Sequence, residues 1–391
     1  MNDRRTIVLA DLHLTRHTPE AVARDLVRLV REHAGARLVF AGDLFDLSAE
    51  TPPVPRERGV EVGLERYPDV ARALAEHVDK DGELYLVSGN HDAEVGQVDM
   101  TGALADALSL RGAARERVQT TPWFFRLGGL HVEHGHLYDP DNAPAHPLIV
   151  SARSLGVHFV EQFIAPTGAF AYLNANDQTP LKLFLSSFTW YGKRAPYVIY
   201  RFFHTAATAL LGSGPFFREE EARAQSEGAT RLAAFAEEQG IDVASAERVL
   251  SARATPTLES MRTTFARLYL DRVAATVGMG AGLTAVGFGH VGAGATIASA
   301  SALAMAASWA LGHDRYAGSV AERLEAGAIS VAEATGAKLV VFGHTHREAS
   351  RGPYANTGSF AFPRGAPGRP FLEIEGSPDA PRAARRYLAA C

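Results

Sequence analysis

Three continuous apolar runs, at residues 6–10, 38–41 and 84–87, stand out in the first part of the chain. Apolar runs without alternation are typical of strands that are covered on both faces. Between them, residues 18–33 and 67–78 carry apolar side chains at helical spacing, so we expect a helix in each interval. This alternation of apolar strands and amphipathic helices predicts an α/β layered domain.

The alternation stops in the middle of the chain and returns near its end. Residues 124–127 and 130–133 are expected to form a hairpin, and from about 139 to 313 no alternation of strands and helices is visible. The pattern resumes with a helix at 319–335 and a strand at 338–342. We therefore expect a core domain that is split in sequence by a long insertion.

These limits divide the chain into four parts. We expect the first part of the core at 1–139, a mostly helical insertion at 140–313, the second part of the core at 314–376 and a C-terminal tail at 377–391. Insertions of this kind are tolerated at loops and often carry function.

Part of the insertion has the composition of a membrane-active segment. Residues 178–218 contain no acidic residue and mix basic with aromatic side chains, and 273–313 contain no Asp, Glu, Lys or Arg. The second stretch is long enough for two membrane crossings of roughly 17–20 residues each, although its Ala and Gly content gives it a modest spanning propensity. Three interpretations stay open: a membrane hairpin, a lid at the lipid surface and a soluble pair of helices. Membrane association through 178–313 is expected under the first two.

The overall charge and the cysteine content limit the expected partners and the expected cellular compartment. The formal net charge of -5 predicts no general attraction to nucleic acid, and no nucleic-acid partner is expected. The single cysteine, Cys391, excludes an internal disulfide and a thiolate metal site, and it fits a reducing compartment. The apolar run at 6–10 is shorter than the roughly 7–15 residues of a secretory core. We therefore expect the catalytic domain to lie in the cytoplasm. Binding of this domain to the inner face of the cell membrane is left open.

Each predicted strand is followed by residues that can bind metals. Four such motifs are Asp11-Leu12-His13, Gly42-Asp43-Leu44-Phe45-Asp46, Gly89-Asn90-His91-Asp92 and Gly343-His344-Thr345-His346, and His134 lies between the third and the fourth. Polar groups that gather at successive strand ends need a common partner, because burying them unpaired is costly. His131 and His136 compete with His134 for the fifth position.

This mixture of ligands suits two divalent metal ions, which can clamp a phosphate and lower the pKa of a shared water. Such a site needs one carboxylate that bridges both ions, and Asp43 is the expected bridge. The other expected ligands form two sets: Asp11, His13 and His346 for one ion, and Asn90, His134 and His344 for the other. Imidazole and carboxylate ligands without thiolate suit manganese, iron or zinc better than calcium, and manganese is the expected metal.

The five motifs, in this order, resemble the D-x-H, G-D-x-x-D, G-N-H-D/E, H and G-H-x-H series of the calcineurin-like metallophosphoesterases. The resemblance covers about 1–138 and 315–376. It implies a four-layer α/β/β/α sandwich and in-line attack of a metal-bridging hydroxide on phosphorus. It also implies that His91 protonates the leaving group or stabilises the transition state, and that Asp92 orients His91. Asp46 is expected to support the loop rather than to bind metal.

Within that family, the basic and aromatic insertion is similar to the lid of UDP-2,3-diacylglucosamine pyrophosphatases, although those enzymes commonly have Arg where His91 stands. We therefore expect hydrolysis of a phosphoester or pyrophosphate bond, in a substrate that is amphiphilic or nucleotide-linked. Pyrophosphate cleavage in lipid A synthesis is a narrower alternative. An alternative of another class is a catalytically silent scaffold, which is usually missing the residue at His91 or a ligand.

Overall fold

The computed structural model of the chain describes residues 4–50, 54–55, 58–97, 100–150, 153–174, 180–312, 319–365 and 367–389. The chain forms two compact units, and each is made of separate segments. Unit 1 consists of Met1–Pro166, Glu219–Pro256 and Val320–Cys391, and unit 2 consists of Thr167–Arg218 and Thr257–Ser319.

The first sheet of unit 1 has six strands in the order β11-β10-β1-β2-β3-β4. Neighbouring strands are parallel from β1 to β4, while β10 pairs antiparallel with both β1 and β11. β1, the first strand along the chain, therefore lies in the interior of the sheet, between β2 and β10, and β10 comes from the end of the chain. The strands are β1 (Thr6–Leu9), β2 (Arg37–Ala41), β3 (Glu83–Val87), β4 (Val118–Thr121), β10 (Arg369–Glu375) and β11 (Arg382–Leu388).

The second sheet has five strands in the order β5-β6-β7-β9-β8. Its central strands β6, β7 and β9 are parallel, and β5 and β8 pair antiparallel at the two edges. The strands are β5 (Phe124–Leu127), β6 (Leu130–Glu133), β7 (Leu339–Phe342), β8 (Glu348–Arg351) and β9 (Tyr354–Thr357). The predicted hairpin at 124–133 and the predicted strand before the last motif are both present.

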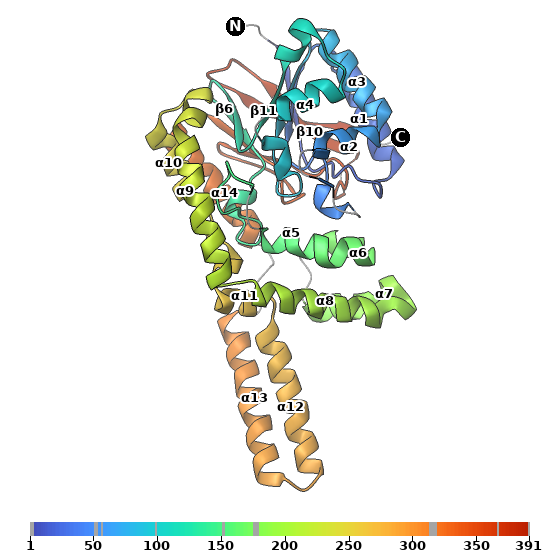
Figure 1. Ribbon diagram of the computed structural model, residues 1–391, viewed down its shortest axis with the longest axis vertical. Coiled ribbons are helices and arrows are strands. Elements are labelled where there is room, and N and C mark those ends of the chain that lie inside the picture. Colours follow the sequence, from blue (N-terminus) through green and yellow to red (C-terminus); the bar gives the residue numbers. More distant parts are fainter. Residues whose placement is uncertain are drawn as a thin grey trace. The chain divides into compact units, whose positions relative to one another are not determined.

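The two sheets pack face to face, and helices cover their outer faces. Val8, Val39, Val132 and Val341 belong to a buried apolar cluster that joins the sheets. A second cluster joins the first sheet to its helices, which lie together in Figure 1: α1 (Glu20–Glu32), α2 (Gly59–Glu65), α3 (Pro68–Asp79) and α4 (Met100–Ala107). A third joins the second sheet to α9 (Pro215–Glu238), α10 (Val243–Ser251) and α14 (Ser319–Thr335). Unit 1 is therefore an α/β/β/α sandwich, as expected.

Short helical turns complete the described chain. They are η1 (Leu47–Ala49), η3 (Ala93–Gly96), η4 (Gly112–Arg117), η5 (His136–Tyr138), α5 (Leu155–Phe159), η6 (Val160–Ile164), α6 (Ala165–Thr167), η7 (Phe170–Asn174), η8 (Gly192–Arg194) and η9 (Thr257–Glu259).

The compact units differ from the expected boundaries at 140–313 and 377–391. Residues 219–256 of the expected insertion belong to unit 1, because Phe235 and Val249 are buried against the second sheet. The expected tail contains β11, which pairs along its whole length with β10. The expected boundary between 313 and 314 lies outside the described residues.

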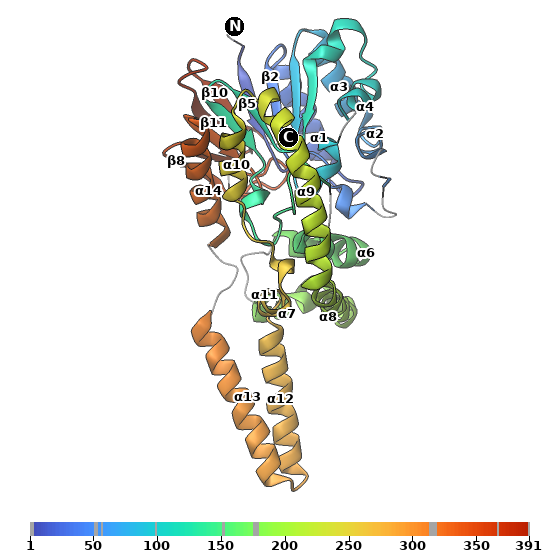
Figure 2. The same cartoon turned by 60° about the vertical axis from the view of Figure 1, so that its left-hand side comes forward.

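Unit 2 is helical. Its longer helices are α7 (Pro180–Tyr191), α8 (Ala195–Leu211), α11 (Met261–Arg267), α12 (Leu270–Gly287) and α13 (Val291–Leu311). Helix α7 packs on α8, α11 contacts both α8 and α12, and α12 lies alongside α13 as an antiparallel hairpin that is visible in Figures 1 and 2. Among the described residues one helical stretch, Val291–Ala310, is long and apolar enough to cross a membrane, a test that a buried helix of a soluble protein can also pass.

Candidate metal centre

The candidate ligands lie at the carboxyl ends of five parallel strands, three from the first sheet and two from the second. Residues at the carboxyl ends of parallel strands meet at one edge of a sheet. Because the two sheets pack face to face, the loops that follow these five strands meet at the same edge of the sandwich. The order along the chain is Asp11 and His13 after β1, Asp43 after β2, Asn90 and His91 after β3, His134 after β6, and His344 and His346 after β7.

Asp11, His13 and His346 form the first cluster that could hold a cation. The Nε2 atoms of the two histidines lie 3.2 Å apart, and His346 Nε2 lies 3.4 Å from Asp11 Oδ1. Asp11 is fully buried, and its Oδ1 has no hydrogen-bond partner in the described part of the chain. A buried, unsatisfied carboxylate oxygen beside two imidazole nitrogens fits a divalent metal ion.

Asp43 and His134 form a second cluster, which shares Asp11 with the first. His134 Nε2 lies 3.1 Å from Asp43 Oδ2 and 3.1 Å from the side-chain oxygen of Asn90, while Nδ1 lies 2.9 Å from the Ala41 carbonyl. Asp43 Oδ2 also lies 3.9 Å from His13 Nε2. The Asp43 carboxylate therefore faces ligands of both predicted ions, which is the position that a bridge requires.

Electrostatics within this cluster favour ionised acids and bases. Burial raises the pKa of Asp43, but the nearby His134 and His91 lower it more strongly, so that it falls well below its usual value. Burial lowers the pKa of His134, but the Asp43 carboxylate raises it to about 9. Asp43 and His134 therefore stabilise each other's charged form.

His344 is the candidate ligand that the structure leaves outside these two clusters. Its ring centroid lies 5.1 Å from that of His134, but its Nε2 lies 2.9 Å from Asp139 Oδ2. Asn142 donates to the same oxygen and accepts from Asn90. His344 thus lies next to the second cluster and is connected to it through a chain of polar side chains.

His91 is held by Asp46 and not by the expected Asp92. His91 Nδ1 lies 3.0 Å from Asp46 Oδ1 and 2.8 Å from Ser48 Oγ. Burial lowers the pKa of His91, and Asp46 followed by Asp43 outweighs this effect and raises the pKa to about 10. Within the described residues His91 Nε2 makes no hydrogen bond, so this nitrogen is available to a substrate.

Asp92 instead organises the backbone beneath the ligands. Its carboxylate accepts hydrogen bonds from the backbone N–H groups of Gly89 (2.7 Å), Asp43 (3.2 Å) and Phe45 (3.2 Å). These bonds direct the Asp92 carboxylate toward the backbone of the loops after β2 and β3, and the described structure gives it no hydrogen bond to the His91 ring. In the described structure the carboxylate in contact with the His91 ring is therefore that of Asp46 and not that of the expected Asp92.

The backbone is strained at the ligands. Eight non-glycine residues of the described chain have positive φ, and five of them are Asp11, His13, Asp43, His344 and His346, with φ between 48° and 69°. The left-handed region is unfavourable for residues with a Cβ, and such strain persists where the surrounding structure enforces it. It is concentrated here at the predicted ligands.

Two motif glycines are required by close approach. A Cβ atom on Gly89 would lie 2.0 Å from Asp43 Oδ1, and one on Gly42 would lie 2.5 Å from the ring of His134. Any larger residue at either position would therefore displace a candidate ligand.

The alternation of β6 places His131 and His134 on opposite faces of the second sheet. Leu130 and Val132 face the other sheet, and His134 continues this face at the end of the strand. His131 points the opposite way and lies with its ring centroid 4.5 Å from that of Phe124. His136 is buried beside His134, and burial followed by His134 lowers its pKa well below the usual value.

Several residues that support the site carry no signal in the sequence. Asn356 donates to the Gly343 carbonyl (2.6 Å) and Ser359 to the Asp11 carbonyl (2.9 Å), so both fix ligand loops. Asn142 and Ser48 contact Asp139 and His91 as described above. Isolated Asn and Ser residues are common in loops, and only the tertiary structure brings these to the ligands.

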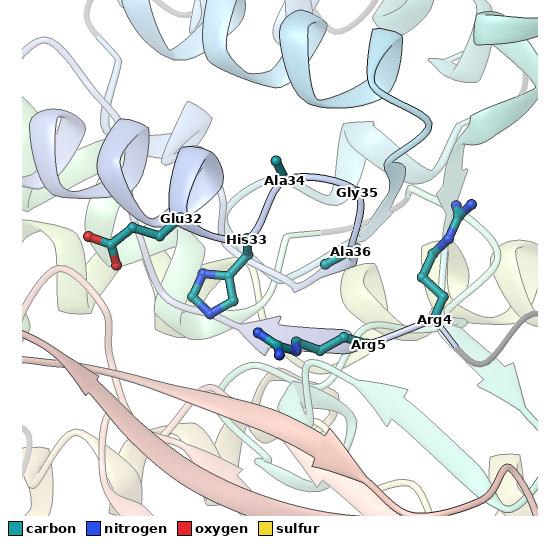
Figure 3. Close-up of a pocket in the computed structure, with 7 residues that line it drawn as sticks. All are labelled: Arg4, Arg5, Glu32, His33, Ala34, Gly35 and Ala36. Carbon is teal, nitrogen blue, oxygen red and sulfur yellow. The ribbon is translucent and has the colours of Figure 1, made fainter.

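A hollow of about 470 Å³ lies at the opposite end of β1, in the view of Figure 3. It is lined by Arg4 and Arg5, which precede β1, and by Glu32 to Ala36 after α1. Arg4 pairs with Glu83 (2.8 Å) and Arg5 with Glu373 (3.0 Å). Its cations already have carboxylate partners, so we assign no ligand to it.

Comparison with known proteins identifies one family. The sequence profile described as "Calcineurin-like phosphoesterase" matches residues 4–243. A search of curated proteins returned no significant match. The matched segment includes the first three motifs and His134, whereas His344 and His346 lie beyond it and reach the same site through the fold.

Proposed function

Because the chain belongs to the calcineurin-like phosphoesterase family, we propose that unit 1 hydrolyses a phosphoester or pyrophosphate bond with two divalent metal ions. The observation that carries this proposal is the pair of Asp and His clusters, Asp11-His13-His346 and Asp11-Asp43-His134, which share Asp11 and are linked by the approach of Asp43 to His13. Phosphoester chemistry is the family's activity, and the exact reaction is our inference.

The proposed metal ligands are those expected from the sequence. Asp43 would contact both ions. Asp11, His13 and His346 would hold one ion, and Asn90, His134 and His344 would hold the other. Two bound divalent ions would polarise the phosphoryl oxygens and generate a hydroxide nucleophile. The oxygen and imidazole donors suit manganese, with iron or zinc as alternatives.

His91 is the proposed catalytic residue, and Asp46 is its positioning residue. Asp46 and Ser48 engage Nδ1, which fixes the ring and leaves Nε2 toward the substrate. A protonated His91 can stabilise negative charge on the transferred phosphoryl group and give its proton to the leaving oxygen. The Asp46 carboxylate favours this protonated form.

We propose that the substrate is amphiphilic or nucleotide-linked. Support comes from unit 2, where Phe184, Phe188 and Tyr200 are exposed beside the basic residues Lys193 and Arg194. Aromatic and cationic side chains together suit a lipid headgroup with its phosphate. Under this proposal UDP-2,3-diacylglucosamine is one substrate to test.

The first test is the Asp43→Asn variant. The purified protein with manganese is offered an aryl phosphomonoester, an aryl phosphodiester and UDP-2,3-diacylglucosamine, and metal content is measured in parallel. We expect a loss of at least ~100-fold in kcat and a lower metal content, because the bridging carboxylate is removed. Release of UMP by the wild type would place the activity on the pyrophosphate.

Asp81→Asn is the matched control, because Asp81 also has a positive φ, of 65°, and lies on the surface of unit 1. Equal activity of Asp43→Asn and the wild type would contradict the bridging role. A wild type that binds metal but hydrolyses none of these substrates would favour the catalytically silent scaffold.

A further inference from the structure

Helices α12 and α13 bury small residues and expose large ones. Ala275 and Gly282 are the buried residues of α12. Leu283 is 66% exposed and Leu303 is 72% exposed, and the same holds for Val277, Phe288, Val291 and Ile297. Helical pairs in water show the reverse, with large apolar residues at the contact and polar residues outside.

The small residues allow the two backbones to touch. A Cβ atom on Gly282 would lie 2.6 Å from the Ala298 nitrogen, and one on Gly294 would lie 2.5 Å from the Gly282 carbonyl. On the same face, a Cβ on Gly278 would meet Ser301 Oγ at 2.3 Å. Membrane helices associate in this way, because lipid provides no hydrophobic drive and close packing of small residues replaces it.

Three exposed threonine hydroxyls of the hairpin are satisfied within their own helices. Thr276, Thr284 and Thr296 each donate to the carbonyl four residues earlier, at 2.8, 2.8 and 2.9 Å. Exposed hydroxyls in water need no such bond. In hydrocarbon every polar group must find a partner inside the protein.

The length and charge of the hairpin match a bilayer. Helix α12 has 18 residues and α13 has 21, about 27 and 31 Å at a rise of ~1.5 Å per residue, against a hydrocarbon thickness of ~30 Å. In the described part of the chain, α13 is the helix with a stretch long and apolar enough to span by itself. Residues 273–313 contain no Asp, Glu, Lys or Arg. The Phe288-Gly289-His290 turn between the helices therefore carries no fixed charge.

Polar and aromatic residues gather at the open end of the hairpin. The Arg272 guanidinium carbon lies 4.7 Å from the ring centroid of Tyr269 and 5.2 Å from that of Trp309. Arg272 also donates to Ser308 Oγ, which in turn donates to Asp271. Tyr, Trp and Arg are the residues that mark the boundary between hydrocarbon and headgroups.

We propose that α12 and α13 form a two-pass transmembrane hairpin, with its headgroup boundary at Tyr269, Arg272 and Trp309. A lipid bilayer fits better than a second copy of the chain, because only 11% of the apolar stretch of α13 is buried and large residues surround the hairpin. A protein partner would cover one face and leave the rest of this surface in water. Basic residues at 182–218 indicate a preference for anionic lipids.

The first experiment measures flotation of the full chain with vesicles of phosphatidylcholine and phosphatidylglycerol. The double variant Val277→Lys/Leu303→Lys places two charges near the middle of the hairpin, and we expect its vesicle-bound fraction to fall at least ~10-fold. The matched control is Val243→Lys/Ile329→Lys, which adds the same charge at exposed apolar positions of unit 1. Equal binding of both variants would overturn the proposal, as would a wild type that is monodisperse without detergent and does not float.

The second experiment determines topology. Cys391 is the single cysteine, so Cys391→Ser provides a background in which Phe288→Cys and Glu259→Cys are introduced one at a time. In sealed vesicles a membrane-impermeant maleimide should reach the two cysteines from opposite sides. Labelling of both from the same side would mean that the hairpin lies on the surface, and the proposal would be wrong. Neither experiment measures hydrolysis, so their outcome is independent of the proposed activity.

Discussion

The pairing of His91 with Asp46 shows what a single motif can and cannot reveal. The sequence presents two carboxylates, Asp46 and Asp92, as possible partners of one histidine. Proximity in sequence favours Asp92, but its carboxylate accepts hydrogen bonds from the N–H groups of Gly89 and Asp43, while Asp46 contacts the ring of His91. The position of the candidate ligands at the strand ends could be predicted, because each follows an apolar strand. The contact between His91 and Asp46, which belong to different loops, could be recognised only from the fold.

This assignment predicts the effect of Asp46→Asn. Loss of the carboxylate removes the group that holds His91 charged and in place, so kcat should fall roughly 10–100-fold while KM and metal content change little. Steady-state kinetics and metal analysis provide the measurement.

Asp92→Asn provides the contrast to Asp46→Asn. Because Asp92 accepts three backbone N–H bonds, we expect lower stability and weaker metal binding from this variant. A purely kinetic defect in Asp92→Asn, or a wild-type kcat in Asp46→Asn, would contradict the exchange of roles.

At the scale of elements, the apolar strands could be predicted and the charged edge strands β8 and β11 could not. β1, β2, β3 and β7 read as continuous apolar runs because both of their faces are covered. The edge strands β8 (Glu-Ala-Ser-Arg) and β11 (Arg-Ala-Ala-Arg-Arg-Tyr-Leu) carry charges toward solvent, which protects the sheet edges but removes the apolar signal. The sequence also indicates that the insertion is mostly helical. It does not indicate which surface α9 and α10 cover.

The assignment of the segment after residue 139 to unit 1 predicts a pH effect. His146 is buried, with Gly228 of α9 against its ring, and its Nδ1 accepts a hydrogen bond from the Leu148 N–H. Burial, followed by the charge of Arg253, lowers the pKa of His146 to about 4. Between this value and the ordinary ~6.5 the unfolded chain binds more protons than the folded one, so acidification through this window costs stability.

His146→Asn keeps an acceptor for Leu148 and removes the titration. The wild type should lose on the order of 1–2 kcal/mol more than the variant between pH ~6.5 and ~4, after allowance for partial screening. Denaturant midpoints measured across this range test it. Parallel pH profiles for the two proteins would show that His146 is not buried in this way.

At the scale of the molecule, the sequence predicted a split catalytic domain, and the structure adds that the division is more finely interleaved. Unit 1 uses three segments and unit 2 uses two. The composition of the sequence identifies residues 273–313 as an apolar segment, because they contain no charged residue. Composition does not predict that residues 219–256 belong to unit 1, because packing against a sheet depends on contacts between residues far apart in sequence.

Removal of the hairpin should separate the two activities that we propose. The ends of α12 and α13 lie together, since Arg272 donates to Ser308, so a short Gly-Ser linker can replace residues 270–312. We expect the shortened protein to keep at least about half of the hydrolysis of a soluble aryl phosphodiester, because none of the proposed ligands is removed, and to lose its affinity for vesicles. Loss of both would indicate that unit 1 depends on the hairpin for its folding.

The interleaving also orders events on the ribosome. β1 is made first but lies between β2 and β10, and β10 begins only at Arg369. His344 and His346 are likewise synthesised after α12 and α13. Chains grow at roughly 5–20 residues per second and fold from their N-terminal end. Under the proposed insertion of α12 and α13, a nascent chain would meet the bilayer while its first sheet and its candidate metal centre are still incomplete, and the proposed hydrolytic activity would be acquired only afterwards.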